Sequence, residues 1–135
     1  MKLAGRQAAA FLAKPDGRKS AILLYGMDAM RVSLKRQQLI KALVGAQAEE
    51  EMRLTRIEAK NLRKEPSLAL DGIKAQGFFP GPRVVFIEGV GDGQATVLET
   101  VLAEWAEGDA TMVVTSSSLN ARSRLRKAFE NDLRA

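Results

Sequence analysis

Four short apolar runs, each followed by a segment of helical periodicity, organise the chain. They predict strands over 21–25 (A-I-L-L-Y), 52–57 (M-R-L-T-R-I), 83–88 (R-V-V-F-I-E) and 111–115 (T-M-V-V-T). The first and third runs are nearly continuous in apolar residues, which is typical of buried strands in a parallel sheet. The second run alternates apolar and polar residues, and this predicts a strand with one solvated face near an edge of the sheet.

The segments between these runs repeat their apolar residues every three or four positions, as amphipathic helices do. We predict helices over 29–44, from Pro66 to about Gln76, from a cap at Asp92 to Gly108, and after a cap at Ser118 or Asn120. Their apolar faces are predicted at Val32, Leu39, Ile40 and Leu43, at Val97, Leu98, Val101, Leu102 and Trp105, and at Leu125, Ala128 and Phe129. A further amphipathic helix near the N-terminus would carry Ala8, Phe11 and Leu12 on one side.

One helix followed by four strand–helix units predicts an α/β fold, with a three-layer parallel sheet and helices on both faces. The length of 135 residues predicts a single domain. All four prolines fall at predicted element boundaries, which supports this assignment. Sheets of this kind usually have a fifth strand, and the chain ends soon after the last predicted helix. We therefore expect the fold to be truncated before that strand.

Composition narrows the possible chemistry. The chain is 46% hydrophobic and 27% charged, as soluble globular domains are, and it has no apolar run of membrane-spanning length. It contains no cysteine and no histidine, which excludes thiol and imidazole nucleophiles, disulfides and zinc sites built on those ligands. The lack of cysteine fits a cytoplasmic location. The formal charge of +5 is compatible with an acidic partner or with nucleic acid.

A fold of this class binds ligands beyond the carboxyl ends of its strands. After the first strand, Gly26, Met27 and Asp28 stand where a phosphate-binding loop would need several glycines and a lysine. The nearest lysine is Lys35, well inside the predicted helix, and Asp28 would repel a phosphate. We interpret the loop as a degenerate nucleotide loop in which Asp28 caps the helix.

The third and fourth strands end in single polar residues rather than in a catalytic set. Glu88 is one carboxylate where a nucleotidase would have an acidic pair for magnesium and water, and we expect it to accept hydrogen bonds from nearby loop N–H groups. Thr115 occupies the place of a polar sensor. The last predicted helix carries Arg122, Arg124, Arg126 and Lys127. These basic residues fit a solvated face, a contact with an acidic subunit, or a contact with a phosphate or with DNA.

The stretch A-Q-G-F-F-P-G-P-R, over 75–83, places two adjacent phenylalanines before a Pro-Gly-Pro turn. It joins a predicted helix to the third strand, so it lies at the end of the sheet remote from the nucleotide loop. Phe78 and Phe79 could fold under the sheet as part of the core. They could equally project as an aromatic anchor for a partner, stiffened by the prolines.

Three segments together resemble the N-terminal domain of the delta subunit of bacterial DNA polymerase III, the clamp-loader subunit that opens the sliding clamp. They are L-L-Y-G-M-D-A-M-R-V, A-Q-G-F-F-P-G-P-R-V-V-F-I-E and S-L-N-A-R-S-R-L-R-K-A-F, and their order and spacing cover residues 20–130. The family often has Leu-Phe at the apolar pair and a small polar turn after it, whereas this chain has Phe-Phe and Pro-Gly-Pro.

The resemblance implies a degenerate AAA+, P-loop-like domain over 1–135 that binds no ATP and no other cofactor or metal. It implies that Phe78 and Phe79 insert into a hydrophobic pocket of the beta sliding clamp. Gln76 and Gly77 would form their helical approach, with Pro80 and Gly81 shaping the turn. Family members continue into lid and collar domains, absent from this chain, through which they join the gamma/tau and delta-prime subunits, and they meet primed DNA indirectly.

From the resemblance we expect a non-catalytic subunit domain of the DNA polymerase III holoenzyme, a nucleotidyltransferase complex of DNA replication. The domain would bind and help to open the clamp. The alternative is a degenerate nucleotide-fold interaction domain that binds DNA or a signalling partner. An active P-loop ATPase or kinase would need the missing phosphate loop. A receiver-like domain would need an aspartate where Glu88 stands and an acidic pair after the first strand.

Overall fold

The computed structural model describes residues 21–26, 28–45, 54–74, 83–106, 109–116 and 123–131. Its strands are β1 (Ala21–Tyr25), β2 (Leu54–Glu58), β3 (Val84–Val90) and β4 (Thr111–Ser116). All three strand pairs are parallel, and the order is β1-β4-β3-β2. The four predicted strands are confirmed, and so is the edge position of the second. The first strand is the other edge of the described sheet, and only Ala21 in it is fully buried, so the prediction of a buried strand was wrong there.

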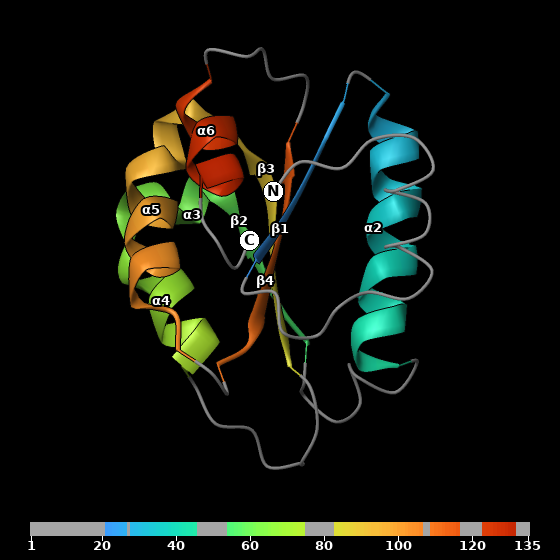
Figure 1. Cartoon of the computed structure of the whole chain (residues 1–135), viewed down its shortest axis with the longest axis horizontal. Helices are drawn as coiled ribbons and strands as arrows, with labels where there is room; N and C mark the ends of the chain where they lie inside the picture. The colour runs from blue at the N-terminus through green and yellow to red at the C-terminus, as the bar shows by residue number, and fades with distance from the viewer. Residues whose placement is uncertain are drawn as a thin grey trace.

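The helices divide unequally between the two faces of the sheet (Figure 1). Helix α2 (Ala29–Val44) covers one face, and α3 (Ala59–Lys64), α4 (Ser67–Lys74), α5 (Ala95–Glu104) and α6 (Arg124–Asn131) cover the other. A short 3₁₀ helix, η1 (Asp92–Gln94), leads into α5. This arrangement confirms the predicted α/β class, with a parallel sheet between two helical layers. The predicted N-terminal helix lies outside the described residues.

Several predicted helix boundaries differ from the observed ones. Helix α3 was not predicted. The helix predicted from Pro66 to about Gln76 is observed as α4, which begins directly after Pro66. Because η1 precedes it, α5 begins only at Ala95 with Gln94 in the cap position, so Asp92 is not its N-cap. The α5 helix also ends at Glu104, before Gly108.

The cap of the last helix differs as well. Helix α6 begins at Arg124, and the Ser123 hydroxyl accepts a hydrogen bond from the backbone N–H of Arg126 at 3.2 Å. Ser123 therefore provides the cap in place of Ser118 or Asn120, which lie outside the described residues.

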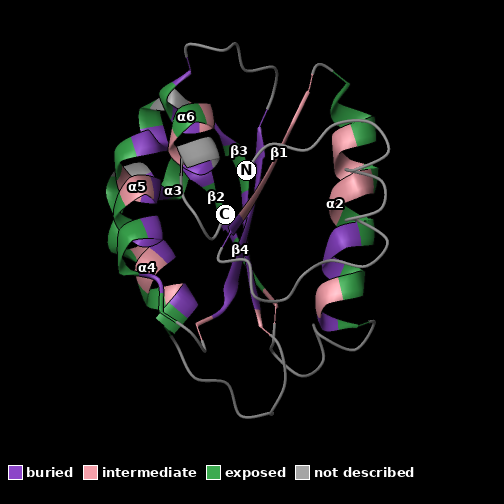
Figure 2. Ribbon diagram, viewed as in Figure 1, coloured by how far each residue is buried: buried purple, intermediate pink, exposed green. Residues whose placement is uncertain are grey.

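One apolar cluster lies on each side of the sheet. Successive side chains of β3 point to opposite faces and therefore belong to different clusters. Between α2 and the sheet the buried residues are Leu39, Ile40, Val44, Val84, Phe86 and Val113. The larger cluster on the other side includes Val85, Ile87, Met112 and Val114 from the strands, with Ile73, Leu98, Val101, Leu102, Trp105, Leu125 and Phe129 from the helical layer. Figure 2 shows the central strands as largely buried. The predicted apolar face of α5 is thus confirmed, except that Val97 is half-buried.

No helix among the described residues has the length and apolar character needed to cross a membrane.

Candidate functional site

A small hollow opens at the carboxyl ends of β1, β3 and β4, beside the first turns of α2. Its volume is about 220 Å³. It is lined by Gly26, Ala29, Val32, Ser33, Arg36, Phe86, Glu88, Gly89, Thr115 and Ser116. The sequence-predicted residues Gly26, Glu88 and Thr115 therefore do come together at the place where open α/β sheets bind ligands. Met27 lies outside the described residues.

Asp28 caps the helix that borders this hollow. Its carboxylate accepts a hydrogen bond from the backbone N–H of Arg31 at 3.1 Å, as an N-cap side chain does. The prediction for Asp28 is confirmed. A carboxylate thus stands at the end of α2 where a bound phosphate would otherwise meet the free N–H groups and the positive end of the helix dipole.

Arg36 and Phe86, which line the hollow, form a cluster with Arg56 of β2. The Arg36 guanidinium lies 4.7 Å from the centre of the Phe86 ring, and the Arg56 guanidinium lies 5.4 Å from it. Both distances are within the range of cation–π contacts. The Nε of Arg36 is buried and has no hydrogen-bond partner among the described residues. We call Arg36, Arg56 and Phe86 the arginine stack.

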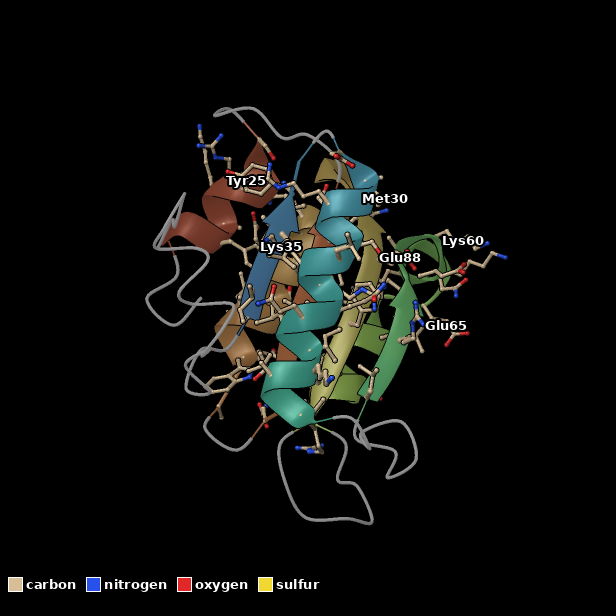
Figure 3. The ribbon with its side chains drawn as sticks, turned by 90° about the vertical axis from the view of Figure 1, so that its right-hand side faces the viewer. Tyr25, Met30, Lys35, Lys60, Glu65 and Glu88 are labelled. Atoms are coloured by element: carbon tan, nitrogen blue, oxygen red, sulfur yellow. The ribbon has the colours of Figure 1, made fainter. Side chains whose placement is uncertain are left out.

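Burial and electrostatics act together on Arg36. Desolvation lowers its pKa, the charge of Arg56 lowers it further, and the charge of Glu88 partly offsets both. Glu88 is exposed beside α2, and its carboxylate lies 3.9 Å from Arg56 (Figure 3). At this distance, in solvent, the pair is a weak ion pair. Glu88 was expected to accept bonds from loop N–H groups, but the contact that the structure gives it is with Arg56.

The end of β3 is irregular, and this shapes the same hollow. Gly89 has a positive φ of 77°, a backbone conformation that favours glycine, and the pairing of β3 with β4 shifts register between Ile87 and Val90. Beyond the shift, the Ser116 hydroxyl donates a hydrogen bond to the Val90 carbonyl. Ser116 is therefore occupied in holding β3 to β4, and Thr115 beside it is buried.

Addition of magnesium-ATP is expected to give a flat calorimetric titration. The α2 N-terminus is occupied by Asp28, and the hollow is smaller than the roughly 300–1,000 Å³ of typical small-molecule sites. A matched titration with Asp28→Asn tests whether the carboxylate is the main obstacle, since this change removes the charge and keeps a capping oxygen. Binding of ATP by the unmodified chain in the micromolar range would contradict this expectation.

At the opposite end of the sheet, the C-terminus of α4 and the start of β3 flank the stretch that carries Phe78 and Phe79. The candidate clamp-binding residues Gln76, Gly77, Phe78, Phe79, Pro80 and Gly81 all lie outside the described residues. Their described neighbours are Lys74 and Arg83. Lys74 Nζ lies 2.7 Å from Asp109 Oδ2, and the carbonyl of Arg83 accepts a hydrogen bond from the N–H of Thr111 at 2.9 Å. The two flanks thus lie at the amino ends of β3 and β4, remote from the hollow.

The basic residues of α6 do not form one free surface. Arg124 makes two hydrogen bonds to the Glu99 carboxylate of α5, at 2.8 and 2.9 Å. The guanidinium of Arg126 lies 5.5 Å from the centre of the Tyr25 ring at the end of β1. Lys127 is exposed, and Arg122 lies outside the described residues. Two of the four basic residues therefore hold α6 to its neighbours.

Because Arg124 and Glu99 form an ion pair, we expect the stability of the domain to depend on pH. The hydrogen bonds from Arg124 lower the pKa of Glu99, partial burial opposes this, and the charge of Arg124 lowers the pKa further. A carboxyl group with a lowered folded pKa stabilises the fold above its unfolded pKa of about 4.3 and loses that contribution as pH falls through the folded value. We expect Glu99→Gln to be less stable than the unmodified chain in urea unfolding at pH 7, with the difference becoming smaller when the pH is lowered to 3.

Glu104→Gln, an exposed change on the same helix, is the control and should show no such pH-dependent difference. An equal difference at both pH values would contradict a role for the Glu99 charge.

Sequence reasoning missed the arginine stack and Asp109. The signal for the stack lies in β2 and β3, where Arg56 and Phe86 are register partners, so that an arginine of the alternating edge strand must lie beside the ring. Asp109 gave no signal beyond its place in a turn, because its partner Lys74 is 35 positions away.

No protein-family model matches the chain, and no curated protein matches it. Among solved structures, the chain is similar to the Bacillus subtilis DNA clamp loader delta protein (YqeN), with a TM-score of 0.69 and 18% sequence identity. The match covers 93% of this chain and 39% of that protein, so the chain spans well under half of its length. This likeness establishes the fold, a parallel-sheet α/β domain similar to that of a clamp loader delta protein.

Proposed function

We propose that this chain is a non-catalytic clamp-loader module that binds the beta sliding clamp. The observation that carries the proposal is the likeness in fold to a clamp loader delta protein over 93% of the chain. The three sequence segments that resemble the delta family add support. At 18% identity the likeness gives the architecture, and the assignment of the partner rests on the sequence segments.

The contact would be made by Phe78 and Phe79, with Gln76, Gly77, Pro80 and Gly81 shaping their presentation. The helix before them and the strand after them are both anchored in the core, through Ile73 of α4 and Val84 of β3. A partner that gripped the two rings would therefore pull on a rigid body. Such a body could hold one clamp interface distorted, with the energy supplied by ATP bound to other subunits of the DNA polymerase III holoenzyme.

The residues of the carboxyl-end hollow support a non-catalytic role. Asp28 caps α2, Glu88 is a single carboxylate next to Arg56, and Ser116 bonds the Val90 carbonyl. None of these described side chains is arranged to hold a nucleotide phosphate or to activate water for its hydrolysis.

The test is a pull-down and a titration with the cognate beta sliding clamp. The full chain is expected to bind, and the variant with both Phe78 and Phe79 changed to alanine is expected to lose binding. Failure of the unmodified chain to bind the clamp would overturn the proposal.

The alternative, binding of duplex DNA by the basic last helix, is less well supported. Arg124, although exposed, is bonded to Glu99, and the guanidinium of Arg126 lies near the Tyr25 ring, so two of the three described basic residues already have partners within the domain. A DNA-binding domain would show duplex affinity that falls steeply with salt. Finding that behaviour, together with no clamp binding, would favour the alternative.

A further inference from the structure

One short segment of the chain is bonded to both flanks of the stretch 75–82. On the α4 side, the N–H of Ala110 donates to the Ile73 carbonyl at 2.9 Å, and Lys74 Nζ lies 2.7 Å from Asp109. On the β3 side, the N–H of Thr111 donates to the Arg83 carbonyl at 2.9 Å. Residues 109–111 therefore set how far apart the two ends of the stretch lie.

The same segment is itself firmly placed. Trp105 is buried and its indole N–H donates to the Ala110 carbonyl at 3.0 Å. The N–H of Asp109 donates to the Ala106 carbonyl at 3.0 Å, which closes the turn. The turn is thus held to the core by a large aromatic side chain just before it and by β4 just after it.

Asp109 is the charged centre of this arrangement. Its Oδ2 accepts both from Lys74 Nζ at 2.7 Å and from the N–H of Ala106 at 2.9 Å, and the side chain is only 16% exposed. Burial raises the pKa of Asp109, but the bond from Lys74 and the backbone bond from Ala106 outweigh it. The charge of Arg83 also lowers the pKa, so the carboxyl group is ionised at neutral pH.

We propose that Asp109 is a positioning residue for clamp binding. Through its ion pair with Lys74 it fixes the end of α4, while Thr111 of the same segment holds Arg83 at the start of β3. The inference rests on the proposed function. Asp109 would not touch the clamp.

The physical reason is preorganisation. A connecting segment whose ends can move relative to each other must be ordered when it binds, and this ordering reduces affinity without changing any contact with the partner. A short ion pair, whose carboxylate is largely buried, would keep the end of α4 at one position relative to β3. Exposed ion pairs contribute little, but this one is short and is reinforced by a backbone bond to the same oxygen.

The experiment compares Asp109→Asn and Lys74→Met with the unmodified full chain. The first change removes the charge and keeps an oxygen for the Ala106 N–H, and the second removes the charge and keeps most of the apolar stem. Each is expected to weaken clamp binding by about tenfold. The double variant should be no weaker than either single variant, because both changes break the same contact.

The matched control is Glu99→Gln, which removes the charge from an ion pair of similar length between α5 and α6. It should leave clamp affinity within about twofold of the unmodified value, whatever its effect on unfolding. A second readout is the rate at which chymotrypsin cuts after Phe78 in the native protein, since the bond between Phe79 and Pro80 resists the enzyme. We expect this rate to rise in Asp109→Asn and to stay unchanged in Glu99→Gln.

The outcomes separate the two proposals. If changing Phe78 and Phe79 abolishes clamp binding while Asp109→Asn and Lys74→Met bind normally, the positioning role is wrong and the proposed function stands. If Glu99→Gln weakens binding as much as Asp109→Asn, the effect is one of general stability and the positioning role is again wrong. If the unmodified chain binds no clamp, the proposed function fails and the inference fails with it.

Discussion

Replacing Phe78 and Phe79 together with alanine is expected to weaken binding of the beta sliding clamp by at least about 100-fold. Full burial of one phenylalanine side chain contributes roughly 1.5–3 kcal/mol, so two rings in a pocket would contribute roughly 3–6 kcal/mol. Since about 1.4 kcal/mol corresponds to a factor of ten, this range corresponds to about two to four orders of magnitude in affinity. A calorimetric or surface-based titration with the purified clamp measures it.

The control is Met30→Ala, which also removes a large apolar side chain. Met30 is 74% exposed on α2, on the other face of the sheet from α4, and it should have no effect on clamp affinity (Figure 3). The circular dichroism spectrum and urea unfolding of the double variant should match those of the unmodified chain. Retention of clamp affinity within about twofold by the double variant would show that the two rings are not the binding site.

The two single variants decide whether both rings reach the clamp. A ring that belongs to the core of the domain should cost roughly 3–5 kcal/mol of unfolding free energy when changed to alanine. Changing a ring that projects toward the clamp to alanine should lower stability little and remove most of the affinity. The sequence left these two roles open for both phenylalanines, and unfolding measured beside binding separates them for each one.

Sheet order shows what the sequence could predict. The edge position of β2 followed from its polar alternation, because a central strand is covered by helices on both faces, and Thr55, Arg56 and Glu58 would then all be buried. The apolar run of β1 suggested burial, yet β1 is the other edge of the described sheet. An apolar strand sequence indicates that the strand packs against helices. It does not indicate how many neighbouring strands are hydrogen-bonded to it.

Helix boundaries were less predictable, for a local reason. Pro66 was assigned to the first turn of a helix, which is a favourable position for proline. It is equally suited to the turn that ends one helix and starts the next, and α3 before it is too short for a periodic pattern to reveal. Likewise Asp92 is a good capping residue, but the chain forms a 3₁₀ turn there and the Gln94 side chain accepts from the N–H of Gly91 instead.

Contacts in the candidate site could be predicted only where the two residues lie close together in the sequence. Asp28 caps the helix that follows it within three residues, and this could be inferred from sequence. The contacts of Lys74 with Asp109 and of Arg124 with Glu99 join residues 35 and 25 positions apart. Nothing in the sequence selects these partners among the 21 basic and 16 acidic residues, because an ion pair leaves no periodic pattern.

Phe86→Ala is expected to lower the unfolding free energy by about 3–5 kcal/mol, which is a large part of the roughly 5–15 kcal/mol of a typical domain. Phe86 is 1% exposed and is a member of the smaller cluster, packed with Leu39, Ile40 and Val113 under α2. Because α2 alone covers this face among the described elements, few neighbouring side chains can shift to fill the space. Urea unfolding with tryptophan fluorescence from Trp105 measures the change.

Phe86 also contacts Arg36 and Arg56, so its replacement changes more than apolar packing. With the ring gone, the guanidinium groups of Arg36 and Arg56 lose their cation–π contacts, and the buried Nε of Arg36 faces a cavity. Phe86→Leu keeps apolar volume and removes only the aromatic face, so it should cost less than Phe86→Ala. If Arg36 stabilises the domain through the ring, Arg36→Met should lower the unfolding free energy of the unmodified chain. The same change should leave the unfolding free energy of the Phe86→Leu variant nearly unaltered. An equal cost in both backgrounds would show that Arg36 acts through its burial and not through the ring.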